Sequence, residues 1–455
     1  MKRSILLVAI GSMVAANLFA QDPQTPSAPV VATKMTFQEA VKIALEKNVI
    51  LNTQKNFLDA SEARKLQGYA GYLPGISAQG SATRANGLQI DPVTGVGSNV
   101  QADNVQASIN ANYTLFNGFN RINLIKQNNT NLLAQVALVQ RTNQDVIFNV
   151  ASQYLTVLLD NQLLDIANEN TRTQQVIFDQ TKEQADVGVR AQADEFTQNS
   201  LLKNAEVAAL RAKILLENDR ATLAQTLQLD PSIDFQLEVP TWESDITYFE
   251  THSLDSLYRI ALANRTDLKQ QTYIAEGWKY TMRLNSSGYY PTVSLFAGYG
   301  STYFHSNDQQ PSFRDQFVKN NPQSNYGVQV NIPIFDRLLT RTNRVVSKVS
   351  YKNAELTRDN LFKTVKIDVQ RSFKNYQTAI ISYKASLSQM EAGELALRVQ
   401  RESYELGVAS QVAVATANQA YVVAASSKAQ AEVTLLFQKI LLEYALGTLR
   451  IEDVP

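Results

Sequence analysis

Cysteine is absent from this chain of 455 residues, and histidine occurs only twice, as His252 and His305. The lack of thiols excludes disulfide bonds, thiolate metal sites, cysteine nucleophiles and lipid anchors attached through cysteine. Two isolated histidines do not make a histidine-rich metal centre. We therefore expect a fold stabilised by packing, with no metal and no cofactor.

An excess of charge of one sign is also missing, because 42 Lys and Arg residues balance 42 Asp and Glu residues. Proteins that bind nucleic acid normally carry a basic excess or patch, so a nucleic-acid partner is not expected. The sequence also lacks a P-loop, a GxGxxG fingerprint, and the HExxH and GxSxG motifs. These absences predict a protein that is not an enzyme.

Long apolar runs are confined to the N-terminus, and nothing beyond it approaches the ~20 residues of a membrane-spanning helix. Residues 1–20 combine Lys2 and Arg3, an apolar stretch and a small final Ala20. This pattern predicts a secretory signal peptide, with an uncleaved anchor helix as the alternative. Residues 21–35 contain three prolines and predict a disordered linker.

The remainder of the chain contains an internal repeat. The motif Tyr72-Leu-Pro74 resembles Tyr289-Tyr-Pro291, at an offset of 291 − 74 = 217 residues. After the next loop the offset becomes 219, because Gly188 matches Gly407 (407 − 188 = 219). We therefore predict two equivalent halves, repeat 1 over 36–230 and repeat 2 over 254–449. A linker over 231–253 separates them, and a tail over 450–455 follows.

Each half is predicted to contain the same elements in the same order. A first helix (36–72 and 254–288) ends at a proline, which cannot continue it. Two β-strands, a very long helix, a glycine tip and a last helix follow. The predicted strands are 75–85 and 104–116, then 292–304 and 324–335; the long helices are 120–185 and 338–404; the tips are 186–190 and 405–409.

The predicted strands alternate apolar residues with polar residues that carry almost no charge. Val105, Ile109 and Tyr113 point one way along the second strand, whereas Gln106 and Asn110 point the other way. Segments of ~10 residues with this pattern are typical of a transmembrane β-barrel wall, although a soluble hairpin with a half-buried face is the alternative. The polar stretches 86–103 and 305–323 predict extracellular loops.

Aromatic residues cluster near the ends of these strands, where amphipathic rings favour the membrane–water boundary. The candidate membrane-interface aromatics are Tyr72, Tyr113, Phe116, Tyr289, Tyr290 and Phe335.

The long helices contain neither proline nor interior glycine through most of their length, and some 66 residues at ~1.5 Å each extend to ~100 Å. Apolar residues recur at spacings of three and four, as in Val365, Val369, Phe373 and Tyr376. Such a stripe indicates coiled-coil packing; a plain helix-bundle core produces the same stripe, and the length of the helix distinguishes the two.

Closure of the barrel predicts oligomerisation. Four strands do not close into a barrel of useful bore, and an open sheet edge in lipid leaves its N–H and C=O groups unpaired. Three copies give 3 × 4 = 12 strands, within the observed range of ~8 to 26. The predicted fold class is therefore an α+β membrane protein, a homotrimer whose 12-stranded transmembrane β-barrel continues into a long α-helical coiled-coil tunnel.

From about Phe37 to Leu449, the sequence resembles the TolC-type outer membrane efflux proteins. The two Tyr-x-Pro motifs, the strand ends Tyr113-Thr-Leu-Phe-Asn-Gly-Phe119 and Ile332-Pro-Ile-Phe-Asp336, and the two glycine tips carry the resemblance. It implies a trimeric exit duct, with a barrel in the outer-membrane lipid and a tunnel that crosses the periplasm. It also implies a periplasmic adaptor protein and an inner-membrane transporter as partners.

The tips have a physical reason of their own, since glycine accepts the positive φ that a rapid helix reversal needs. In the resembling family such tips meet the helical hairpins of the adaptor. The candidate docking residues are Val187, Gly188, Val189, Leu406, Gly407 and Val408. The alternative is that both glycines only cap helices.

The sequence departs from the family at the periplasmic aperture. The family's acidic ring lies six and nine residues after the second tip glycine, where this chain has Ala413 and Thr416. Asp194 and Glu195 follow the first glycine instead, with Arg190 nearby, and form a candidate aperture. Alternatively, these residues lie on a solvated helix face, where Arg190 pairs with Asp194 at i,i+4.

The sequence thus predicts an outer-membrane exit duct that passively conducts small molecules or proteins from an inner-membrane pump to the outside. The alternative is a structural or adhesive trimeric coiled coil of the envelope without a conducting lumen. A periplasmic binding or enzymatic module lacks a recognisable site.

Overall fold

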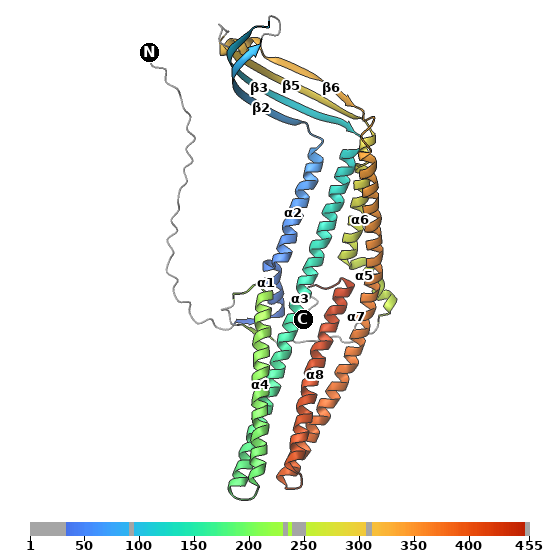
Figure 1. Ribbon diagram of the computed structural model, residues 1–455. Helices are drawn as coiled ribbons and strands as arrows, with labels where there is room; N and C mark the ends of the chain where they lie inside the picture. Colours follow the sequence, from blue (N-terminus) through green and yellow to red (C-terminus); the bar gives the residue numbers. More distant parts are fainter. Residues whose placement is uncertain (1–32, 91–94, 231–234, 239–251, 306–311, 451–455) are drawn as a thin grey trace, which may run out of the picture.

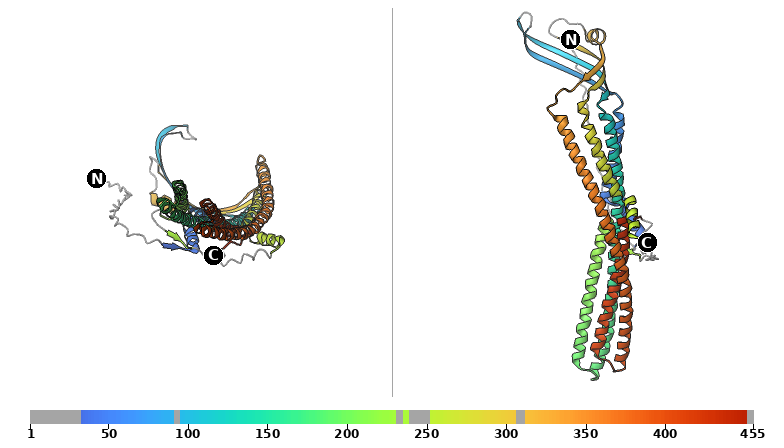
Figure 2. Two further views of the ribbon diagram at one scale, coloured as in Figure 1. Left: turned by 90° about the horizontal axis from the view of Figure 1, so that it is seen from below. Right: turned by 90° about the vertical axis from the view of Figure 1, so that its right-hand side faces the viewer.

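The computed structural model describes residues 33–90, 95–230, 235–238, 252–305 and 312–450. The predicted signal peptide, most of both linkers and nearly all of the tail lie outside them. A β-sheet at one end is joined to long helices that extend away from it (Figure 1). Seen along the helices, sheet and helices follow one curved arc with a concave side (Figure 2). The described part of the chain is therefore a curved layer.

The sheet has the order β2-β3-β5-β6 and is antiparallel throughout. Its strands are β2 (Gly75–Ile90), β3 (Gly97–Asn117), β5 (Thr292–His305) and β6 (Gln323–Asn331). Pairing of β3 with β5 joins the two hairpins across the whole sequence, with Ile109 opposite Tyr299. Within the described residues, β2 and β6 are the two edges of this sheet.

Two helices of 67 residues each leave the sheet, α3 (Asn120–Asp186) and α7 (Leu339–Glu405), within one residue of the predicted bounds. Each reverses into a shorter helix, α4 (Gln192–Thr226) and α8 (Gln411–Leu446). In the half distant from the sheet α3 packs on α4 and α8, and α7 packs on α8. Among the described residues, no helix has the length and apolarity to cross a membrane.

The first helix of each half is interrupted, contrary to the expectation of one continuous helix. Asn48 separates α1 (Phe37–Lys47) from α2 (Val49–Ala70), and Arg265 separates α5 (Leu254–Asn264) from α6 (Thr266–Leu284). Both residues have extended backbones, with ψ of 121° and 113°. The Asn48 side chain accepts a hydrogen bond from the Leu51 N–H, which begins α2 anew because asparagine is a good N-cap.

The junctions between strands and long helices are alike in both halves. Gly118 and Phe119 have positive φ before α3, as do Arg337 and Leu338 before α7, at an offset of 337 − 118 = 219. The carboxamide of Asn117 accepts a hydrogen bond from the Arg121 N–H. In the second half the carboxylate of Asp336 accepts one from the Thr340 N–H, again 219 residues later.

The polar stretch 86–103, expected to be a loop, is mostly strand. The β2–β3 ladder continues to the pair Ile90 and Gly97. The Asn, Gln and Ser side chains of this stretch resemble those of a solvated loop. A strand ladder is formed by backbone hydrogen bonds, however, and is compatible with such polar side chains. The predicted loop 305–323 contains one turn of π-helix, η2 (Asp315–Asn320).

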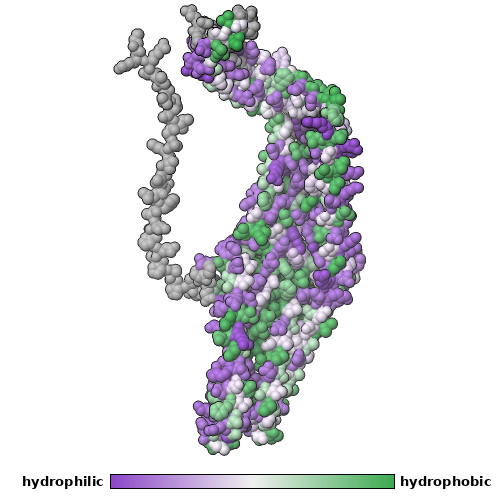
Figure 3. All heavy atoms as spheres, in the orientation of Figure 1, coloured by the Kyte–Doolittle hydropathy of each residue, from purple (hydrophilic) through white to green (hydrophobic). Residues whose placement is uncertain are grey.

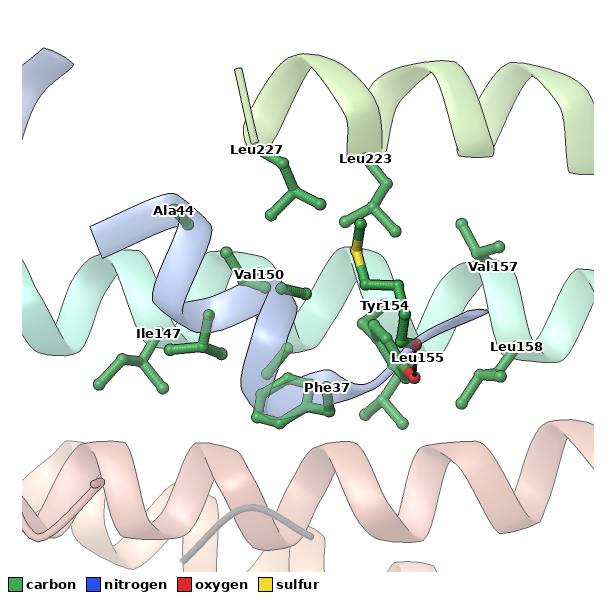
Figure 4. Packing of buried hydrophobic residues seen from close by; sticks show 14 of the residues in the cluster. Phe37, Ala44, Ile147, Val150, Tyr154, Leu155, Val157, Leu158, Leu223 and Leu227 are labelled. Atoms are coloured by element: carbon green, nitrogen blue, oxygen red, sulfur yellow. Dashed lines mark hydrogen bonds between the residues drawn. The ribbon is translucent and has the colours of Figure 1, made fainter. Parts of the chain in front are cut away.

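The main apolar core lies midway along the helices (Figure 4). On the face of the helices seen in Figure 3, hydrophilic and hydrophobic residues are mixed. There α1 places Phe37, Val41 and Ala44 against α3, with Leu223 of α4 on the other side. Tyr154 is fully buried between them, and its hydroxyl donates to the carbonyl oxygens of Met35 and Glu238. Those carbonyls belong to or directly follow β1 (Thr33–Met35) and β4 (Phe235–Leu237), a small parallel pair.

Candidate functional site

The four-stranded sheet has one apolar and one polar face. The register places Ala78, Ile109 and Tyr299 in one row, and Ala111, Ala297 and Tyr326 in another. Since side chains two residues apart on a strand share a face, both rows lie on the apolar face. The opposite face carries Gly298 and the uncharged polar residues Ser77, Gln79, Ser108, Asn110, Asn325 and Gln329, with Phe296 and Phe304 as the apolar exceptions on β5. A wall with this difference suits lipid on one side and water on the other.

The candidate interface aromatics gather where the sheet meets the helices. Tyr113 and Phe116 lie on β3, whereas Tyr72, Tyr289 and Tyr290 lie in the turns that precede β2 and β5. The Arg121 guanidinium lies over the Tyr72 ring, 4.7 Å from its centroid. Phe119, an aromatic that the sequence reasoning did not select, packs edge-on against both Phe116 and Tyr290.

Phe335 differs from its expected position. The strand was expected to run over 324–335, but β6 ends at Asn331. Pro333 has no N–H to donate, and a proline is therefore unfavourable in a continuing ladder. Phe335 lies between β6 and α7 and is 76% exposed.

The two tips at the far end of the molecule have the same backbone geometry. Gly188 has φ 77° and Gly407 has φ 75°. The Val189 N–H donates to the Gln184 oxygen at 2.9 Å, and the Val408 N–H donates to the Ser403 oxygen at 2.9 Å. These bonds terminate α3 and α7 in the manner of a Schellman motif.

The apolar residues that flank these glycines project into solvent. Val187 and Val189 are each 74% exposed, and Leu406 and Val408 are 80% and 82% exposed. A side chain at either glycine would meet open space, so the glycines are required by the backbone and not by crowding. The tips therefore present a small apolar surface at the end of the long helices.

The candidate aperture residues are spread over the first tip. Asp194 and Glu195 lie in the first turn of α4, where negative charge is favourable at a helix N-terminus. The Arg190 guanidinium lies 4.5 Å from the centroid of the Tyr404 ring on α7. Arg190 thus connects the first tip to the second helical hairpin, which α7 and α8 form.

A buried layer of amides joins the helical hairpins α3–α4 and α7–α8 just above the tips, and the sequence reasoning missed it. Gln198 of α4 is 1% exposed; it donates to Gln174 of α3 at 2.7 Å and accepts from Gln411 of α8 at 2.9 Å. Higher up, Asn418 of α8 donates to Asn170 of α3 at 2.7 Å. Glutamine and asparagine at core positions of the three-four pattern would have been the signal.

A cleft of about 460 Å³ lies beside this layer between α3, α4, α7 and α8. Gln174, Gln198, Tyr404 and Gln411 are among the residues that line it. The Tyr404 hydroxyl is a buried polar atom that has no hydrogen-bond partner within the described residues. Near the tips, the helical hairpins are therefore joined by polar contacts beside an open cleft. Farther up, an apolar core joins them.

A two-faced sheet on a rod of ~100 Å defines a class of protein, the elongated outer-membrane channel whose helices extend below the membrane. The model of the family "Outer membrane efflux protein" matches residues 40–227 and 257–448. The chain therefore belongs to the outer membrane efflux protein family. It is an exit duct of the outer membrane that extends into the periplasm.

Known proteins agree with this assignment. The chain is 23% identical to the outer membrane protein TolC of Salmonella enteritidis over 392 residues, with 77% of this chain and 75% of that protein covered. It is 21% identical to the toluene efflux pump outer membrane protein TtgC of Pseudomonas putida over 452 residues, with coverages of 89% and 86%. The CmeC outer membrane channel of Campylobacter jejuni shares the fold, with a TM-score of 0.78, 16% identity, and coverages of 90% and 85%.

Proposed function

We propose that three copies of this chain close into one 12-stranded barrel continuous with a helical tunnel, which conducts cargo passively to the outside. The observation that carries the proposal is the sheet with one apolar and one polar face, whose edges are β2 and β6. An unpaired edge is not tolerated in lipid, so β6 of one copy needs β2 of the next. Four alternating strands keep that junction antiparallel, like every other pairing in the sheet.

The equivalent junctions support the proposal that the two halves, 36–230 and 254–449, arose by duplication. Positive φ at Gly118 and Arg337, and at Gln228 and Gly447, recurs at an offset of 219 (447 − 228 = 219). Arg337 and Gln228 adopt this backbone although glycine would do so at less cost. Six similar hairpins in a trimer would then surround the axis almost evenly.

The tips are the proposed docking surface for a periplasmic adaptor protein that links the duct to an inner-membrane transporter. Exposed Val187, Val189, Leu406 and Val408 offer apolar contact at the end of the rod. Asp194, Glu195 and Arg190 are proposed to line the aperture between the tips. The duct has no chemistry of its own in this proposal, and the transporter supplies the energy.

Conductance across a planar bilayer, combined with the mass of the detergent-solubilised complex, tests this function. We expect trimers that form discrete, long-lived conducting steps. Trimers that never conduct would contradict a channel and support a structural coiled coil of the envelope. A stable monomer in lipid vesicles would contradict the shared barrel.

A further inference from the structure

Strand β5 extends beyond the strand that pairs with it. The last β5–β6 pair is Gly300 with Gln323, whereas β5 continues to His305. On its other edge β5 remains paired with β3 up to the pair of His305 and Asp103. The β6-side edge of residues 301–305 therefore needs another partner for its backbone groups.

The segment Ser312–Asn321, which contains η2, takes that place. The Gln316 carboxamide accepts from the Phe304 N–H at 3.1 Å and donates to the Phe304 oxygen at 2.9 Å. Asn321 donates to the Thr302 oxygen at 2.6 Å. Ser301 donates through its hydroxyl to the Phe317 oxygen at 2.6 Å. The segment therefore replaces a strand at this edge with side-chain hydrogen bonds.

Aromatic packing fixes the segment on the apolar face of the sheet. The Phe313 ring packs against Tyr303 and Phe317, with both centroid distances 5.0 Å. Tyr303 lies on the face of Tyr299 and Leu295, since alternate residues of a strand share a face. Phe313 and Val318 nevertheless remain 48% and 60% exposed. Within the described residues, these two apolar side chains on a tethered segment are thus only partly covered.

The proposed barrel brings an unequal pair of strands together beside this segment. Strand β6 has 9 residues and β2 has 16, so β6 of one copy cannot pair with all of β2 in the next. Because both strands meet the helices at the same end, the unpaired part of β2 is its outer part.

The register agrees with this placement. Residues 301–305 of β5 lie level with 103–107 of β3 and hence with 80–84 of β2 in the same chain. Gly75, the first residue of β2, is level with Gly327, four residues outward from the end of β6 at Asn331 (331 − 327 = 4). In a barrel whose strands tilt by ~35–45°, strands are shifted along one another by roughly 4–6 residues over four strands. Residues 80–84 of one copy are therefore level with β2 residues ~84–90 of the next copy, which face the segment.

We propose that Ser312–Asn321 is a clasp that docks on the outer part of β2, residues 84–90, of a neighbouring copy. Leu88 and Ile90 there are 69% and 61% exposed and supply the apolar counterpart to Phe313 and Val318. The clasp rests on the proposed trimer, and it seals the outer end of the junction between copies where β6 is too short to do so.

Engineered cysteines test the clasp directly, because the native chain contains none. The double variant L88C/V318C would be treated in purified trimers with a short bismaleimide cross-linker, as would I90C/V318C. We expect covalent dimers and trimers on denaturing gels. The matched control V189C/V318C pairs residues at opposite ends of the molecule and is expected to give monomers.

Val318→Asp, with Asn320→Asp as a control that adds the same charge at an exposed residue of η2, gives a second readout. The Val318 variant is expected to lower the temperature at which trimers dissociate, and the Asn320 variant to leave it unchanged. Conducting trimers that give no cross-link, or a bimane label on V318C that brominated lipid quenches as strongly as one on a lipid-facing strand residue, would overturn the clasp and leave the channel intact. A monomeric protein would refute both.

Discussion

The guanidinium of Arg190 lies 4.5 Å from the centroid of the Tyr404 ring, so the turn between α3 and α4 contacts the last turn of α7. Arg190 follows the first tip glycine by two residues, and Tyr404 precedes the second by three. A cation over an aromatic face contributes about 0.5–1 kcal/mol at exposed sites. This contact therefore joins the free ends of the two hairpins, which otherwise meet through amides.

Replacement of Arg190 by Ala is expected to loosen the tips. Without the guanidinium, the Tyr404 ring loses its partner and the aperture is held by fewer contacts. Single-channel conductance is expected to rise, together with uptake of large antibiotics by cells that express the variant. Lys182→Ala removes one exposed charge from the same end of α3 and is the control; equal conductance in both variants would contradict a role for Arg190 in closing the aperture.

The tip glycines are expected to tolerate no substitution without strain. Gly188→Ala meets no neighbour, but it places a Cβ on a residue with φ 77°, which costs about 1–2 kcal/mol. Gly393→Ala, inside α7 and in ordinary contact with α8, is the control. Drug-resistance assays and adaptor co-purification are expected to show a loss for Gly188→Leu and Gly407→Leu, with trimers still formed. Normal export by both Leu variants would show that the tips are not docking sites.

The fold was largely predictable because periodicity decides it. Alternation placed Val105 and Ile109 on one face, and the three-four pattern with absent proline gave both long helices to within one residue. The interruption at Asn48 was not predictable from propensity, since asparagine also occurs on exposed helix faces. It becomes visible only when α1 is seen to pack across α3 while α2 continues toward the sheet.

The site was predictable in its backbone and less so in its contacts. Positive φ at Gly188 and Gly407 follows from the residue type in a reversal. The Arg190–Tyr404 contact and the pair of Gln174 and Gln198 join parts of the chain whose relative rotation the sequence does not specify. Side-chain partners across helices therefore needed the structure.

Tyr154→Phe is expected to destabilise the middle of the molecule. The variant keeps the apolar packing of the ring but leaves the Met35 and Glu238 oxygens without its hydroxyl donor. A net loss of about 1–2 kcal/mol per chain is expected, because a buried acceptor loses its partner. Hydrogen exchange of Lys34 to Met35 in β1 measures the local effect. Tyr258→Phe removes a hydroxyl with one exposed contact of 3.5 Å and is expected to change little.

The two faces of the sheet are expected to differ sharply in their tolerance of charge. Ile109→Lys places an ammonium on the apolar face, where a cation near the bilayer midplane costs roughly 2–4 kcal/mol. Ser108→Lys, the adjacent residue, places the same group on the polar face of β3. Assembly into heat-modifiable trimers in lipid vesicles is expected to fail or slow only for Ile109→Lys. Equal assembly of both variants would contradict lipid contact at that face.

Asp160 predicts how the stability of the helical part depends on pH. Burial, and then a hydrogen bond to Asp219 of α4, raise the pKa of this α3 carboxyl to about 7. The folded pKa lies above the unfolded value of 3.8, so the folded chain binds the proton more tightly. Stability is therefore greatest below pH 4 as far as this group is concerned, and it falls as pH rises toward 7.

Asp160→Asn is accordingly expected to stabilise the protein at pH 8 and to flatten the decline between pH 4 and 7. A shift of one pKa unit corresponds to about 1.4 kcal/mol, and sharing of the proton with Asp219 reduces the full effect to an expected ~1–3 kcal/mol. Thermal denaturation of the trimer at a series of pH values measures it. Asp165→Asn, one turn farther along α3, is the control. A decline in Asp160→Asn as steep as in the native chain would show that folding does not raise the pKa of Asp160, because removal of such a group leaves the slope between pH 4 and 7 unchanged.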